Sequence, residues 1–122
     1  MQMYDGIPVE ELAIEEVDWT ERGDYIRTRS ARKGRPEFEV EPEWATEAAT
    51  EPRRLLGLDL ASRSQRTIHV IGWSAAAGKL LTVILLPKHR PPDGRWFGVN
   101  AWASNSRDER AYRTGTNEDD GG

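Results

Sequence analysis

The sequence predicts an α+β fold in which two N-terminal helices and one C-terminal helix pack on a small antiparallel sheet. Two helix-compatible segments lie before residue 53, strand-like segments follow residue 66, and a capped helical segment begins after residue 104. Grouped helices and grouped strands are typical of this class. A length of 122 residues is enough for one domain with one modest hydrophobic core.

The first helix is predicted over Asp24–Lys33, because Gly34 and Pro36 then form a helix stop. The second is predicted from Pro42, which suits a first helical turn, to about Glu51, where Pro52 ends it. Small apolar side chains recur along this segment at helical spacing, so one of its faces is expected to be buried.

Three strands and a last helix follow the polar stretch 59–65. Arg66–Trp73 is rich in β-branched residues, Lys79–Leu86 is apolar on both faces, and Arg95–Ala103 follows a proline-rich loop. A short strand is also predicted near Val17–Trp19. Asn105 stands three residues before Asp108, the spacing of a helix N-cap. We therefore expect an antiparallel meander with the helices on one face.

Charge is distributed unevenly along the chain. Residues 1–17 and 117–122 hold eight of the 21 acidic residues and no Lys or Arg, so all 17 basic residues lie between them. The predicted organisation is an acidic N-terminal extension over residues 1–16, one domain over 17–113, and a flexible acidic tail over 114–122. The extension is either a solvated end or a segment that folds back over a basic surface and competes there with a polyanion.

Composition excludes several classes of site. The chain contains no cysteine, and His69 and His89 are its two histidines, so a zinc site is not expected. The run Leu80–Leu86 is far shorter than the roughly 20 apolar residues that span a bilayer. The acidic N-terminus lacks the pattern of a secretory signal, so we expect a cytoplasmic protein without a membrane partner.

Three stretches, taken in order, resemble the BrnT family, the toxin half of a bacterial toxin–antitoxin pair, whose members look like small RelE-type ribonucleases. They are "VDWTERGDYIRTRSARKGRPEFEVEPEWATEAATEP", "RTIHVIGWSAAAGKLLTVILL" and "VNAWASNSRDERAY", and they span about Val17 to Tyr112. The positions that match the family's pattern are Arg66, Gly72, Gly78, Ala101, Asp108 and Tyr112, with Asn105 replacing a capping threonine.

The resemblance implies a RelE-like fold, a toxin that cleaves RNA without a metal or cofactor, and a cognate antitoxin that neutralises it. DNA would be contacted only through the antitoxin. Cleavage beside a 2′-hydroxyl needs a proton acceptor and cations that stabilise the phosphorane. The expected catalytic residues are Arg66, Lys33 and Arg32. The expected RNA-binding residues are Arg27, Arg29, Arg63, Arg107, Trp102 and Asn100.

The last strand departs from the family at three positions. Phe97 and Trp102 stand where the family carries arginines, and Asn100 replaces a serine. The alternative is therefore a catalytically inactive, BrnT-like binding module that acts through a protein partner or in a DNA-bound regulatory complex. Trp102 could stack on an RNA base, fill a partner's pocket or close the core. His69 is either a general base or a half-buried histidine held by a hydrogen bond.

Overall fold

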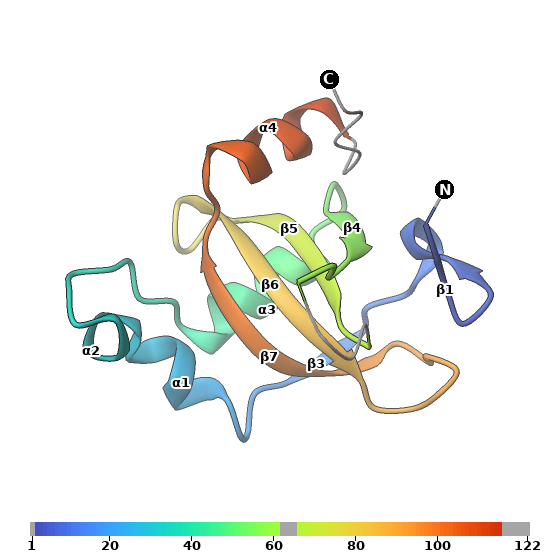
Figure 1. Cartoon of the computed structure of the whole chain (residues 1–122), viewed down its shortest axis with the longest axis horizontal. Helices are drawn as coiled ribbons and strands as arrows, with labels where there is room; N and C mark the ends of the chain where they lie inside the picture. The colour runs from blue at the N-terminus through green and yellow to red at the C-terminus, as the bar shows by residue number, and fades with distance from the viewer. Residues whose placement is uncertain (1, 62–65, 116–122) are drawn as a thin grey trace.

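The computed structural model describes residues 2–61 and 66–115, and these form an α+β fold (Figure 1). The helices are α1 (Gly23–Arg27), α2 (Arg29–Lys33), α3 (Pro42–Thr50) and α4 (Ser106–Thr114), with a short 3-10 helix, η1 (Val9–Glu11). The strands are β1 (Met3–Tyr4), β2 (Ile7–Pro8), β3 (Glu16–Asp18), β4 (Leu55–Leu58), β5 (Ile68–Ser74), β6 (Lys79–Pro87) and β7 (Arg95–Ala103).

The central sheet has the strand order β3-β7-β6-β5-β4 and is mixed. The pairs from β4 to β7 are antiparallel, as the meander predicts, but β3 runs parallel to β7, so the prediction of a purely antiparallel sheet is wrong. Parallel neighbours need a long connection, and here most of the chain separates the two strands. Strand β4 was not predicted, because four residues between Pro52 and Asp59 are too short to show a period.

Helix α3 covers one face of the sheet and carries the predicted stripe of small side chains. Ala45, Ala48 and Ala49 are fully buried. Close packing is possible because Gly72 on β5 has no side chain: a Cβ atom there would lie 1.8 Å from the carbonyl oxygen of Ala48. The N-terminal turn of α3 begins at Pro42, as predicted.

The predicted helix over residues 24–33 is interrupted. Thr28 lies outside helical geometry between α1 and α2, and its hydroxyl donates to the carbonyl oxygen of Asp24 at 2.7 Å. Such a side-chain bond competes with the helical ladder. Gly34 ends α2 in the left-handed conformation, which confirms the predicted stop.

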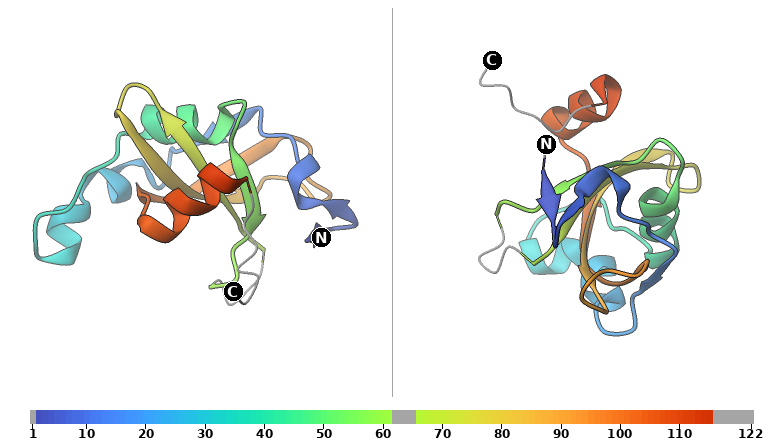
Figure 2. Two further views of the ribbon diagram at one scale, coloured as in Figure 1. Left: turned by 90° about the horizontal axis from the view of Figure 1, so that it is seen from above. Right: turned by 90° about the vertical axis from the view of Figure 1, so that its right-hand side faces the viewer.

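Helix α4 lies on the face of the sheet opposite α3, so the expectation that all helices share one face is wrong (Figure 2). Asp108 on α4 contacts Thr82, whose side chain points away from the face that holds Leu81 and Val83. Strand β6 is apolar on both faces because a helix covers each face of the sheet there.

A β-bulge at Val99 changes the facing of β7. Leu85 pairs with Gly98 and Ile84 with Asn100, so Val99 is the extra residue. Without the bulge, strand alternation would put Trp96 on the same face as Asn100 and Trp102, and Phe97 on the opposite face. The structure reverses this: Trp96 is fully buried and Phe97 is 40% exposed.

The N-terminal segment is part of the core and is not a solvated end. Tyr4, Val9, Leu12 and Ile14 are all buried and belong to the main hydrophobic cluster. The Tyr4 hydroxyl donates to the backbone oxygen of Arg66 at 2.6 Å, which ties the segment to the start of β5. Residues 2–16 therefore fold together with the rest of the domain.

Candidate functional site

A cavity of about 310 Å³ lies where α4 meets the sheet face opposite α3. Four of its lining residues have chemistry relevant to RNA: His69, Trp102, Arg107 and Asp108. Strand register brings the first two together, because His69 on β5 pairs with Ile84, which pairs with Asn100 near Trp102 on β7. The side chains of His69 and Asp108 are 21% and 17% exposed, so both are accessible from the cavity.

A chain of polar groups anchors Asp108. Its Oδ2 atom accepts a hydrogen bond from Thr82 Oγ1 at 2.8 Å and lies 3.7 Å from His69 Nε2. Thr82 Oγ1 is also 2.8 Å from Ser104 Oγ. Since a hydroxyl has one proton and Thr82 gives it to the carboxylate, Ser104 is the donor in the second bond. The carboxylate therefore faces the imidazole in a defined position.

Two contacts set the position of α4. Asn105 is the N-cap that the sequence predicts, and its side chain accepts from the backbone N–H of Asp108 at 2.9 Å. At the other end of the helix, the Tyr112 hydroxyl donates to Glu51 Oε1 at 2.5 Å. Burial and this hydrogen bond raise the pKa of Tyr112. The helix that carries Arg107 and Asp108 is thus held at both ends.

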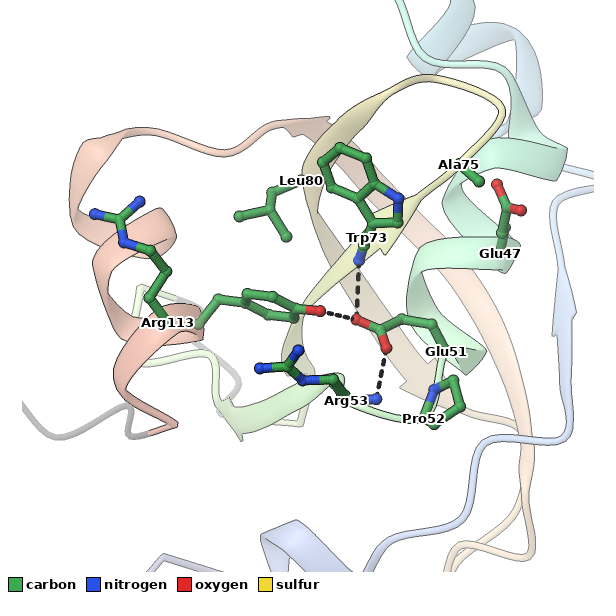
Figure 3. Close-up of a pocket in the computed structure, with 9 residues that line it drawn as sticks. Glu47, Glu51, Pro52, Arg53, Trp73, Ala75, Leu80 and Arg113 are labelled. Atoms are coloured by element: carbon green, nitrogen blue, oxygen red, sulfur yellow. Dashed lines mark hydrogen bonds between the residues drawn. The ribbon is translucent and has the colours of Figure 1, made fainter.

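Glu51 stands in a second, largely apolar cavity of about 590 Å³ between the end of α3, the β5–β6 hairpin and α4 (Figure 3). Its carboxylate also accepts from the backbone N–H groups of Trp73 and Arg53. Because these bonds go to backbone N–H groups and to Tyr112 on α4, we assign this carboxylate the role of holding α4 against α3.

The basic residues of α1 and α2 have different environments. Arg29 lies with its guanidinium carbon 5.7 Å from the centre of the Trp102 ring and pairs with Glu37 at 3.2 Å. Arg27 is held by Asp24 and Glu41 in ion pairs within its own region. Of these two, Arg29 therefore approaches the cavity, through Trp102.

The three residues predicted as catalytic do not form one centre. Helix α2, which carries Arg32 and Lys33, lies on the other side of the molecule from the start of β5, where Arg66 is found (Figures 1 and 2). Arg32 packs on Tyr25, 3.5 Å from the ring centre, and Lys33 is exposed. Arg63 lies outside the described residues, as does most of the tail, 116–122.

Asn100, expected to bind RNA, uses its side-chain oxygen locally and accepts from the backbone N–H of Ala101 at 2.9 Å. Asp108 was missed as a site residue, although the sequence marks it as part of a helix cap. The signal that could have identified it is Thr82, a polar residue inside an apolar strand, because a buried hydroxyl needs a hydrogen-bond partner.

The arrangement in the first cavity can support acid–base chemistry on a phosphodiester. The imidazole of His69 faces a carboxylate that can hold its orientation, an arginine lines the same space, and an indole ring offers a stacking surface. In the described ranges, no group of three or more His, Asp or Glu side chains is placed to hold a metal ion.

Comparison with protein-family models, curated proteins and solved structures finds no match to this chain. Over the residues that the structure describes, every helix is too short or too polar to cross a bilayer.

Proposed function

We propose that the chain is the toxin of a bacterial toxin–antitoxin pair and acts in the cytoplasm as a metal-independent endoribonuclease. One observation carries the proposal: a single cavity brings together His69, Asp108, Arg107 and Trp102. The resemblance to BrnT supports it, because the order of elements from β3 to α4 agrees with the order of motifs on which the resemblance rests. A RelE-like fold and a cognate antitoxin belong to the same proposal.

In the proposed reaction, the 2′-hydroxyl of the RNA attacks the adjacent phosphorus to form a cyclic 2′,3′-phosphate. The bond to the 5′-oxygen breaks, and this leaving oxygen takes a proton from solvent water. His69 accepts the 2′-proton, and Asp108 orients the imidazole and stabilises the imidazolium that results. Arg107 stabilises the charge that develops on the phosphorane. Trp102 stacks on a neighbouring base and so holds a single strand across the cavity.

The test is incubation of the purified chain with a long single-stranded RNA in EDTA, followed by a denaturing gel. We expect cleavage by the parent chain and its loss in His69→Ala and in Asp108→Ala. The matched control is His89→Ala, because His89 forms an exposed pair with Asp93 at 2.8 Å outside the cavity. Thermal unfolding checks that each variant is folded. Equal cleavage by the His69 and His89 variants would overturn the assignment.

Arg66→Ala separates this site from the one predicted by sequence. Arg66 does not line the cavity in the described part of the chain, so we expect this variant to cleave RNA like the parent. A loss of cleavage equal to that of His69→Ala would return Arg66 to the centre.

The second candidate function is a binding module that has lost catalysis. The observation that favours it is the aromatic ring of Phe97, which is 40% exposed on the sheet. Tight RNA or protein binding by a parent chain that leaves RNA intact, both alone and with ribosomes, would select this alternative.

A further inference from the structure

Tyr25 on α1 lies between two arginine side chains. The guanidinium carbon of Arg22 is 3.8 Å from the ring centre and that of Arg32 is 3.5 Å from it. Two guanidinium groups cannot share one ring face at such distances, so they occupy opposite faces. Their carbons are therefore about 7 Å apart, the sum of the two distances.

Over the part of the chain that the structure describes, each guanidinium donates one hydrogen bond to a backbone oxygen and keeps other N–H groups for a ligand. Arg22 Nε donates to the carbonyl oxygen of Val99, the bulged residue of β7, at 2.9 Å. Arg32 Nε donates to the backbone oxygen of Tyr25, also at 2.9 Å. Within residues 2–61 and 66–115, neither arginine forms an ion pair with a carboxylate. Two fixed, uncompensated positive charges at this separation fit neighbouring phosphates of a single strand.

Arg22 also lines a cavity of about 570 Å³ over the open face of β7. Phe97 also lines this cavity and is 40% exposed, and Lys88 Nζ lies 5.1 Å from the centre of its ring. Two acids share the cavity: Asp18 is paired with Lys88 at 2.9 Å, and Glu21 is exposed. A carboxylate repels phosphate but can accept N–H groups of a base edge. The cavity therefore suits a base, and the two arginines suit the neighbouring phosphates of the same strand.

The same strand connects this cavity to the proposed active site. Phe97 and Trp102 lie on one face of β7, roughly 15 Å apart at the rise of an extended strand. We propose that Phe97, Arg22 and Arg32 form a second nucleotide subsite, at which an unpaired RNA base stacks on Phe97 while each arginine binds one of two neighbouring phosphates. The RNA strand then runs along β7 toward Trp102 and His69. This inference rests on the proposed function, since it names the path of its substrate.

The experiment measures binding separately from cleavage. Fluorescence anisotropy is recorded with a labelled RNA of about eight nucleotides, 2′-O-methylated so that it cannot be cleaved, and with a trinucleotide that can fill only one subsite. We expect Phe97→Ala to weaken binding of the longer RNA about tenfold and to leave the trinucleotide unchanged. Arg32→Gln should lower the slope of log affinity against log salt by about 0.7, the value for one phosphate contact on a single strand.

Matched controls remove a similar group elsewhere. Trp73→Ala deletes an exposed aromatic ring, and Arg110→Gln deletes an exposed cation, and neither residue lines this cavity. If Phe97→Ala and Arg32→Gln bind the longer RNA like these controls while the parent binds and cleaves RNA, the subsite is overturned and the proposed function stands. If the parent binds no RNA, both the subsite and the proposed function are overturned. The surface of β7 around Phe97 would then be assigned to a protein partner.

Discussion

Thr82→Val tests whether the buried hydroxyl of β6 holds Asp108 in place. Thr82 is fully buried, and its hydroxyl donates to a carboxylate whose side chain is 17% exposed. A hydrogen bond to a charged group contributes about 1.5–3 kcal/mol to stability. Because water can replace part of this bond at Asp108, we expect the lower end, about 1.5–2 kcal/mol lost in the free energy of unfolding.

A double-mutant cycle isolates this bond. The free energy of unfolding in urea is measured for the parent, Thr82→Val, Asp108→Ala and the double variant, and we expect a coupling energy of about 1.5 kcal/mol. Thr82→Ser is the control, because it keeps the hydroxyl and loses one methyl group, worth about 1 kcal/mol. It should retain the coupling with Asp108.

The same variants are assayed for RNA cleavage. Releasing Asp108 from the sheet should lower the rate at least tenfold in Thr82→Val, because a misplaced orienting group is costly in catalysis. A coupling energy below about 0.5 kcal/mol would refute the structural argument, since that is the level at which independent sites appear additive. Normal cleavage by Thr82→Val with full coupling would refute the catalytic role alone.

Three further predictions concern stability. Gly72→Ala should lower the free energy of unfolding in urea by about 3 kcal/mol or more, because its Cβ would overlap the carbonyl oxygen of Ala48. Gly78 is left-handed at φ +66° and has open space around it, so Gly78→Ala should cost about 1–2 kcal/mol. Equal costs for the two variants would contradict the packing of α3. Tyr112→Phe should be less stable than the parent at pH 7. Burial and the Glu51 bond raise the pKa of Tyr112, so its stabilising contribution is present below pH 10 and is lost as the phenol ionises; a difference that persists at pH 12 would contradict this. Hydrogen bonds from Thr20 and Lys88 hold the pKa of Asp18 well below its usual range. The parent should therefore have a higher free energy of unfolding than Asp18→Asn, by an amount that is constant at neutral pH and shrinks as pH falls below about 4. A difference that does not change with pH would argue against this role of Asp18.

Local signals predicted most of the elements that carry the site. The bounds of β7 agree with the predicted Arg95–Ala103, and α4 begins after Asn105 as its cap predicts. These features depend on side-chain period and on groups within a few residues of each other. The predicted centre at Arg66, Arg32 and Lys33 had no such support, because their proximity depended on how α2 sits against β5.

The sequence by itself determined the α+β class and the positions of the main helices and strands. Those properties follow from periods of 3.6 and 2 residues, which neighbouring residues encode. The tertiary structure alone decided the parallel pairing of β3 with β7, the bulge at Val99, the burial of the N-terminal segment, and the placement of α4 opposite α3. Each of these depends on contacts between segments far apart in the chain, whose free energies no local pattern reports. The contacts of Asp108 with His69 and Thr82 depend on the placement of α4, and so does the cavity that Asp108 and His69 line.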